Sequence, residues 1–405
     1  MSKKYLKGLF ILLLLIGFTL PALAQYEVDL SGNIPLYGQE DCCWCGAASG
    51  QMIMDGYPDP VNRLYHEQED IWDAIQVNNI DAKWCTDPEG LRQTLIDMNP
   101  PPSPGNWYVF TNPNRNEALF DILHWMNMND YPVATLINRG GHWVVIVGYE
   151  TDIEPVGGSN PVLQEITKYD PEPHNVGSVI TKSAAVWYAT DWVGPVQYAG
   201  TWHSQYVAVI EPPVIKGAVK VKMVRRIGKE IIPPEEAIKY AKNWIDELEL
   251  SKKPQYTILE ERGVSNLQPM LVREEIKPGL EKEKEVPYYY IVPFGFEHEI
   301  GDYGIGLARI CVIINAYTGR FEEIGAFGKP VRYILKEEVI DIIASYLALK
   351  REEVEKLKPT LMFQPSDITH IRLYPFWRIM VADRVLYVDQ MGKVYKVITP
   401  SVPGD

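Results

Sequence analysis

After residue 24 the chain lacks any apolar run long enough to cross a membrane. Before that point, Lys3, Lys4 and Lys7 precede the apolar run 9–20, and Ala22-Leu23-Ala24 follows it. A basic start, a short apolar stretch and a small-residue cleavage site are the features of a secretory signal peptide. We therefore expect residues 1–24 to be removed. The mature chain is expected to be secreted or periplasmic, and not attached to a membrane.

Basic residues are also scarce. The chain has 39 Lys and Arg against 53 Asp and Glu, a formal net charge of −14. Without the three lysines of the predicted signal peptide, 36 basic residues would remain against 53 acidic ones, a net charge of −17. An acidic chain is poorly suited to bind nucleic acid or anionic membrane surfaces, so neither is expected as a partner.

Cysteines are few, and their number is odd: Cys42, Cys43, Cys45, Cys85 and Cys311. In an oxidising compartment an odd number leaves a thiol without a disulfide. Cys85 is a candidate partner for Cys42 or Cys43, and either pairing would leave Cys45 free. Cys42 and Cys45 also form a C-x-x-C pair, but a redox site would need a surrounding βαβ pattern and a zinc site a second ligand pair. No metal or cofactor is therefore expected.

The 405 residues are too many for a single hydrophobic core, and two or three domains are expected. The composition changes near Glu211-Pro212-Pro213, from a Trp-, Tyr- and Gly-rich part with little Lys to Lys- and Glu-rich runs. We place the domains at 25–213, 214–330 and 331–400.

Apolar spacing in the first domain predicts helices over 45–55 and 117–128. Strands are predicted over 133–138, 142–150, 164–169, 183–188 and 206–210. A helical half followed by a strand-rich half indicates an α+β fold with a cleft between two lobes.

The second part contains a weak internal repeat. Helices are predicted to begin at Pro234 and Lys336, and each is followed by an aromatic-Pro-aromatic strand, 290–294 and 373–377. Each unit then closes with a hairpin whose turn holds a glycine, Gly319 or Gly392, suited to a positive φ. Two small helix-plus-antiparallel-sheet modules are expected.

The candidate chemistry lies in two short motifs. Cys45 opens a small-residue helix, six residues after Gln39, and a thiol at a helix N-terminus near an imidazole is activated as a thiolate. His142 follows Gly140-Gly141 and begins an apolar strand, where a general base could reach such a nucleophile. A buried structural cysteine and a core histidine are the alternatives. The two motifs together favour acyl transfer through a thioester.

A base of this kind needs a group that fixes its tautomer. Asp170 ends the strand expected beside that of His142, with Asp191 and Asp152 as fallbacks. Gln39 would donate its side-chain N–H to the oxyanion, together with the backbone N–H of Cys45. The other histidines are expected to be structural or surface residues: His66, His124, His174, His203, His298 and His370.

Residues 39–54 and 140–171 resemble a papain-like cysteine peptidase. They are closest to the bacterial branch that includes bacteriocin-processing peptidases and secreted effector proteases. The matching positions are Gln39, Trp44-Cys45, Ala47-Ala48-Ser49, Gln51-Met52, Gly141-His142 and Asp170-Pro171. The resemblance implies a two-lobed domain that cleaves peptides or proteins, with Cys45 as nucleophile, His142 as base, Asp170 as orienting group and Gln39 as oxyanion donor.

The chain departs from this pattern at two points. Gly46 stands where many relatives have Trp, and no inhibitory propeptide of papain type fits between Ala24 and Gln39. The C-terminal units are similar to PepSY-like or cystatin-like modules, which implies an intramolecular inhibitor or chaperone. A transpeptidase using the same residues and a catalytically silent peptide-binding module are the alternative functions.

Overall fold

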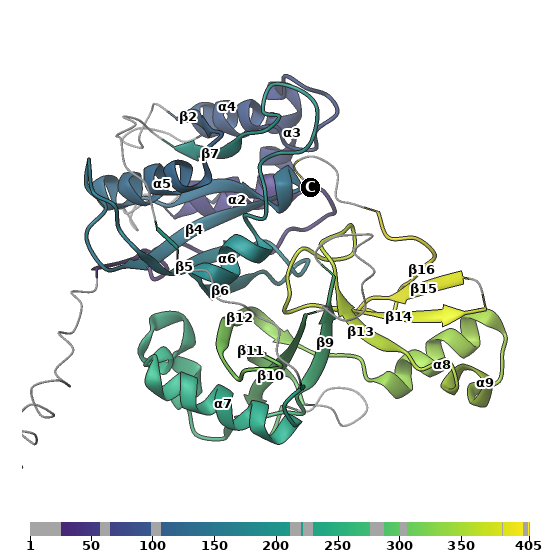
Figure 1. Ribbon diagram of the computed structural model, residues 1–405. Coiled ribbons are helices and arrows are strands. Elements are labelled where there is room, and N and C mark those ends of the chain that lie inside the picture. Colours follow the sequence, from purple (N-terminus) through teal and green to yellow (C-terminus); the bar gives the residue numbers. More distant parts are fainter. Residues whose placement is uncertain are drawn as a thin grey trace, which may run out of the picture.

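The computed structural model describes residues 26–56, 65–98, 107–210, 220–221, 230–275, 287–299, 306–382, 384–399 and 404. They form a mixed α+β structure on one large, mostly antiparallel sheet (Figure 1). The α+β prediction is confirmed at this level. The predicted signal peptide and most of the expected domain boundary near 213–230 lie outside the described residues. Among the described residues, no helix has the length and apolar character needed to span a membrane.

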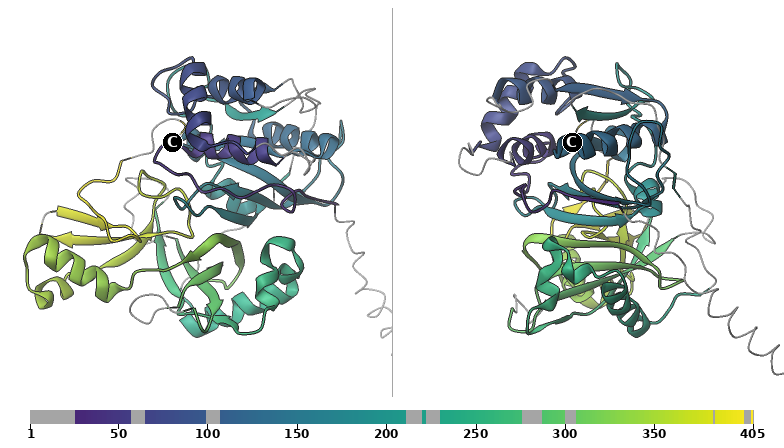
Figure 2. Two further views of the ribbon diagram at one scale, coloured as in Figure 1. Left: turned by 180° about the vertical axis from the view of Figure 1, so that it is seen from behind. Right: turned by 90° about the vertical axis from the view of Figure 1, so that its left-hand side faces the viewer.

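The first part of the chain contains helices on both faces of its share of the sheet (Figures 1 and 2). Its helices are α2 (Cys45–Asp55), α3 (Gln68–Asn78), α4 (Pro88–Met98), α5 (Arg115–Asn129) and α6 (Ala184–Thr190), with the 3₁₀ turn η1 (Asn138–Gly140). Its strands are β1 (Tyr26–Asp29), β2 (Tyr108–Asn112), β3 (Val133–Ile137), β4 (His142–Thr151), β5 (Leu163–Asp170), β6 (Ser178–Ser183) and β7 (Tyr206–Ile210). Both predicted helices are confirmed, as are four of the five predicted strands.

The strand predicted over 183–188 is wrong, because this segment is helix α6. Strand β6 ends at Ser183, where the chain turns into the helix. Ala184, Trp187 and Tyr188 are all buried, which is the i, i+3, i+4 spacing of one helix face. In so short a segment, β-branched and aromatic residues gave a strand pattern although the buried positions follow the helical period.

Helix α2 packs against strand β4, and all residues of both elements are buried. The first turn of the helix is made of small residues, Gly46, Ala47, Ala48 and Ser49. A Cβ added at Gly46 would lie 2.4 Å from the side chain of Thr86, so the close approach depends on glycine there. This packing brings the N-terminus of α2 to the beginning of β4.

The second part of the chain extends the same sheet. Its helices are α7 (Pro234–Glu247), α8 (Lys336–Leu347) and α9 (Arg351–Glu355), with 3₁₀ turns η2 (Leu250–Lys252) and η3 (Pro254–Glu260). Its strands are β8 (Val264–Asn266), β9 (Met270–Glu274), β10 (Tyr288–Phe296), β11 (Ala308–Asn315), β12 (Phe321–Val331), β13 (Thr360–Phe363), β14 (Phe376–Val381), β15 (Arg384–Val388) and β16 (Val394–Tyr395).

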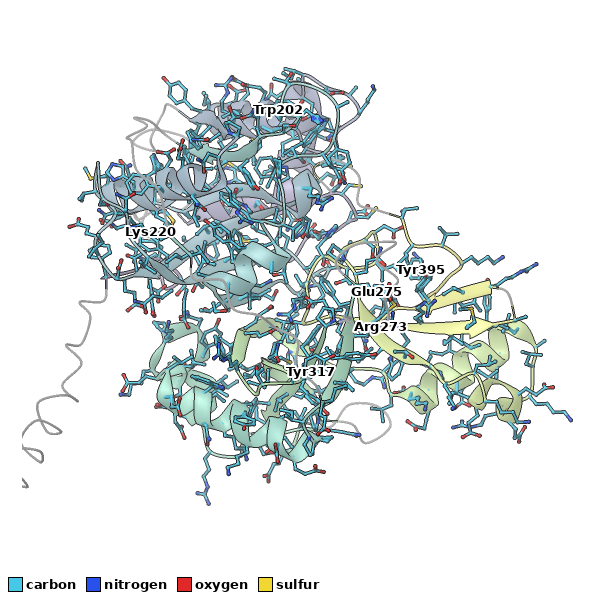
Figure 3. The ribbon with its side chains drawn as sticks, in the orientation of Figure 1. Trp202, Lys220, Arg273, Glu275, Tyr317 and Tyr395 are labelled. Atoms are coloured by element: carbon cyan, nitrogen blue, oxygen red, sulfur yellow. The ribbon has the colours of Figure 1, made fainter. Side chains whose placement is uncertain are left out.

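The strand order is β16-β15-β14-β13-β9-β10-β11-β12-β6-β5-β4-β3-β7-β2, with β1 beside β4 and β8 beside β10. Two pairings connect the predicted domains: β6 with β12, antiparallel, between the first and second, and β9 with β13, parallel, between the second and third. At the second junction Arg273 Nη2 lies 3.1 Å from Glu275 Oε1, and both side chains are labelled in Figure 3. The predicted domains are therefore hydrogen-bonded through one sheet.

The repeat predicted in the second part agrees with its elements. Helices begin at Pro234 and Lys336, and antiparallel strands follow each of them. Gly319 and Gly392 lie in hairpin turns with φ of 65° and 80°. One detail is wrong: Leu373 to Pro375 precede strand β14 rather than form it. Their backbone is held in a turn, where the Gln390 amide donates to the Pro375 carbonyl at 2.6 Å.

Candidate active site

Cys45 is the first residue of helix α2. The first N–H groups of a helix have no partner within it, and they favour negative charge nearby. The backbone N–H of Trp143 also donates to Cys45 Sγ at 3.3 Å. Both features stabilise a thiolate at this position.

The other described cysteines differ from Cys45 in environment. Burial and the neighbouring Asp41 raise the pKa of Cys42 to about 11. Burial raises the pKa of Cys311 to about 12. No disulfide joins Cys85 to Cys42 or Cys43 in the described part of the chain. Among the described residues, no group of three or more His, Cys, Asp or Glu side chains could hold a metal ion.

His142 is the first residue of strand β4, directly after the turn at Gly140, whose φ is +90°. The expected pairing of the His142 strand with the Asp170 strand is present, because β4 and β5 are antiparallel neighbours. It places His142 Nε2 2.8 Å from Asp170 Oδ1, with both side chains fully buried. The contact with Asp170 leaves Nδ1 of the ring for a hydrogen bond with Cys45.

The electrostatics of this group favour a charged imidazole. Burial opposes a charge on His142, but the Asp170 carboxylate and the Cys45 sulfur outweigh it and raise the pKa of His142 well above its ordinary value. Burial also opposes the Asp170 carboxylate, yet Lys168 and His142 hold the pKa of Asp170 well below its ordinary value. The arrangement is therefore suited to an imidazolium between a carboxylate and a sulfur.

The fallback aspartates occupy other places. Asp152 follows the far end of β4, where its Oδ1 accepts the Val162 N–H at 2.6 Å. Asp191 belongs to a buried network behind Asp170: Lys168 Nζ donates to Asp170 at 2.7 Å and to Asp191 at 2.6 Å. These two lysine contacts make Asp191 a neighbour of Asp170 rather than of His142.

The buried network continues into the second part of the chain. Lys182 bridges Asp191, at 2.5 Å, and Glu323 of β12, at 3.4 Å. Glu323 in turn lies 3.4 Å from Arg372. Burial opposes the charge on Asp191, but Lys168 and Lys182 lower its pKa to about 2. Alternating charges thus connect the carboxylate beside His142 with the second part.

Gln39 is close to this group but does not contact Cys45 in any described hydrogen bond. Its Nε2 lies 3.0 Å from His174 Nε2 and 3.4 Å from the Asp41 carbonyl. Its backbone N–H donates to the Pro171 carbonyl at 2.9 Å, which fixes it beside the end of β5. The residue is therefore held near the site, with its side-chain amide directed to His174.

Two residues that the sequence did not single out also lie here. The ring of His370 stacks on that of His142, with centroids 4.4 Å apart and an interplanar angle of 9°. The His370 N–H donates to Glu172 Oε2 at 2.6 Å, and the Glu172 N–H donates to Asp170 Oδ1 at 3.1 Å. Burial and the neighbouring His142 charge lower the pKa of His370 well below its ordinary value. The second residue is Gly404, whose carbonyl oxygen lies 3.5 Å from Cys45 Sγ.

The candidate site and the aromatic residues of this part of the chain are largely buried. Cys45, His142 and Asp170 have no exposed surface, so the cleft expected between two lobes is not open over these residues. Four tryptophans of this part of the chain, Trp143, Trp187, Trp192 and Trp202, are core residues. Trp44 is half-buried and stacks on Trp72 with centroids 5.8 Å apart. His66 precedes α3, and its Nδ1 lies 2.7 Å from Asp55 Oδ1.

Comparison of the chain with protein-family models, with curated proteins and with solved structures gives no match.

Proposed function

We propose that this chain is an exported cysteine-type peptidase that hydrolyses peptide bonds through a thioester on Cys45. The observation that carries the proposal is the buried group Cys45–His142–Asp170. It joins a thiol at a helix N-terminus, an imidazole with a raised pKa and a carboxylate 2.8 Å from that imidazole. The resemblance of residues 39–54 and 140–171 to papain-like peptidases supports the same reading, including a two-lobed peptidase domain over 25–213.

The proposed reaction has two halves. His142 takes the thiol proton, and Cys45 Sγ attacks the carbonyl carbon of the peptide bond. The C–N bond breaks as His142 returns the proton to the leaving amine, and the acyl group remains on sulfur. Water then attacks the thioester, again giving a proton to His142, which releases the acid and restores the thiol. The backbone N–H of Cys45 and the side chain of Gln39 would stabilise the oxyanion, once Gln39 leaves His174.

A transpeptidase would use the same residues, with an amine in place of water in the second half. The partner in both cases is a peptide or protein chain, and neither reaction needs a metal or another cofactor. The predicted signal peptide supports export to the periplasm or the medium.

The proposal is tested by incubating peptide mixtures with the purified mature chain and with Cys45→Ser, then measuring product masses. We expect cleavage by the wild type that disappears in Cys45→Ser, with each new carboxyl end carrying the elements of water. Cys42→Ser is the matched control and should retain cleavage. Products joined to an added amine would favour the transpeptidase. No Cys45-dependent product under reducing conditions would favour the silent binding module.

A further inference from the structure

Gly404, close to the C-terminal end of the sequence, contacts the candidate active site. The Gly404 N–H donates to the Gly140 carbonyl at 2.8 Å, and the Gly404 carbonyl accepts from Cys45 Sγ at 3.5 Å. Figure 1 marks this end of the chain beside α2, although β16, the last strand before it, lies at the edge of the sheet and α2 packs on the central strand β4. One residue of the tail thus bridges the turn before His142 and the nucleophile candidate.

The position fits glycine and no larger residue. Gly404 has a φ of +69°, and a Cβ added to it would lie 2.1 Å from the Thr86 carbonyl oxygen. That carbonyl cannot withdraw easily, because it accepts the Trp143 indole N–H at 3.0 Å. The side chain of the same threonine packs against Gly46 of α2. Thr86 therefore contacts Gly404, helix α2 and Trp143, the residue after His142.

The chain just before the tail is fixed close by. Thr399 and Asp367 exchange three hydrogen bonds, of 3.0 and 2.6 Å to the Asp367 carboxylate and 3.1 Å to the Thr399 carbonyl. Three residues beyond Asp367, His370 stacks on His142. Thr399 and Gly404, five positions apart, are thus each held by hydrogen bonds to other parts of the chain. A short tether of this kind gives an effective concentration on the order of 1 mM.

We propose that the C-terminal tail of this chain is an intramolecular ligand of the Cys45 site, bound through Gly404, which a substrate must displace. The role of the tail as an inhibitor rests on the proposed peptidase function, whereas its binding does not. The Gly404 carbonyl accepts the thiol hydrogen and so favours the protonated, unreactive form of Cys45. It also occupies the space next to sulfur that the carbonyl of a substrate would need.

The test compares the rate at which iodoacetamide alkylates Cys45, located by peptide mass mapping, in variants of the full mature chain. One variant ends at Thr399, and a second carries Gly404→Val, whose side chain would collide with Thr86. Gly32→Val is the matched control, because a Cβ there meets nothing within 4 Å. If the tail binds with a dissociation constant of about 0.1 mM, both tail variants should react about tenfold faster than wild type.

A synthetic peptide with the sequence of residues 399–405 should protect Cys45 in the variant that ends at Thr399. The same peptide with valine in place of glycine should not. Unchanged alkylation in both tail variants, with a rate that still depends on His142, would overturn the tail proposal and leave the peptidase function standing. Faster alkylation in the tail variants without dependence on His142 would support the tail contact and contradict the peptidase.

Discussion

At the residue scale, the His142 ring has a different group on each side. Asp170 binds its Nε2, Cys45 is hydrogen-bonded to it, and His370 stacks on its face. The carboxylate contributes most to keeping the imidazole charged in a buried place. Lys168 holds this carboxylate from behind at 2.7 Å. The protonation state of His142 should therefore depend on Asp170 more than on any other aspartate.

The substitution Asp170→Asn should lower the pKa of His142 by about one unit or more, because the neighbouring negative charge is lost. With seven histidines in the chain, the ring signals can be assigned by substitution and followed by NMR as the pH is raised. The His142 midpoint should move to lower pH in the variant. The control Asp152→Asn, at the far end of β4, should leave it in place. An unchanged midpoint in Asp170→Asn would contradict the assignment of Asp170 as the orienting group.

The same substitution should also lower the free energy of unfolding, by about 3 kcal/mol, since a buried charged partner is removed. Lys168 keeps its second partner, Asp191, which limits the loss. Urea unfolding measures this change directly. An unchanged urea midpoint would show that the contacts of Asp170 make no net contribution to the free energy of unfolding.

Part of the site was predictable from the sequence because its signals are local. Cys45 precedes a run of small residues, and Asp170 ends a strand just before Pro171. The contacts of Gly404 and His370 had no such signal. Their contacts with the site join residues at least 198 positions apart, and a glycine near a chain end or a histidine in a loop has no distinctive neighbourhood in sequence. The direction of the Gln39 side chain was likewise unpredictable, because His174 competes for it.

At the element scale, helix α2 shows how packing against β4 sets the position of the thiol. Its glycines, Gly46 and Gly50, face different surroundings. The Cβ of an alanine at Gly46 would meet Thr86 at 2.4 Å, while at Gly50 it would meet Leu91 at 3.3 Å. Helix α6 was predicted as a strand because its seven residues are too few to separate a helical period from a strand pattern, although Ala184, Trp187 and Tyr188 lie on one helix face.

The two glycines allow a matched comparison. Gly46→Ala should lower the free energy of unfolding by about 1–3 kcal/mol, because overpacking outweighs the better helix propensity of alanine. Gly50→Ala should be neutral or stabilise by up to about 1 kcal/mol, since the Leu91 side chain can give way. Thermal and urea unfolding of both variants measure the difference. Equal effects at the two positions would show that the contact with Thr86 does not limit the packing.

At the scale of the whole molecule, the expected domains share one sheet. The β6–β12 pairing continues the sheet across them, and one core cluster includes Trp143 of the first part and Ile245 of α7. Sequence composition indicated a boundary but could not reveal this pairing, because strand partners far apart in sequence leave no periodic signal. The stacking of His370 on His142 adds a titratable contact between the parts.

That contact should make the molecule sensitive to acid. The folded state lowers the pKa of His370, so its contribution to stability is present above the unfolded pKa of about 6.5 and is lost as the pH falls below it. The raised pKa of His142 acts in the opposite sense and its contribution is already complete below that pH. Asp170, Glu172, Lys168 and His174 also face His370. The free energy of unfolding should fall by about 2 kcal/mol between pH 6.5 and 5 because of His370.

The substitution His370→Phe keeps a ring that can stack on His142 but removes the titrating group. The fall in the free energy of unfolding between about pH 6.5 and 5 should therefore be smaller in this variant. The exposed His203→Phe is the control and should keep the wild-type slope. Unfolding free energies measured from pH 7.5 to 5 give the comparison. A His370→Phe variant with the full wild-type slope would show that other groups cause the acid sensitivity.

The proposed function requires that His142 activates Cys45, and irreversible labelling of the thiol measures this activation. A thiol-peptidase inhibitor is added to the mature chain and to the variant ending at Thr399, each with and without His142→Ala, and the labelled residue is located by mass mapping. We expect labelling at Cys45 that is faster without the tail and is lost when His142 is replaced. If His142→Ala leaves the labelling rate unchanged in both backgrounds, or if Cys45 is not labelled after mild reduction, His142 does not activate Cys45.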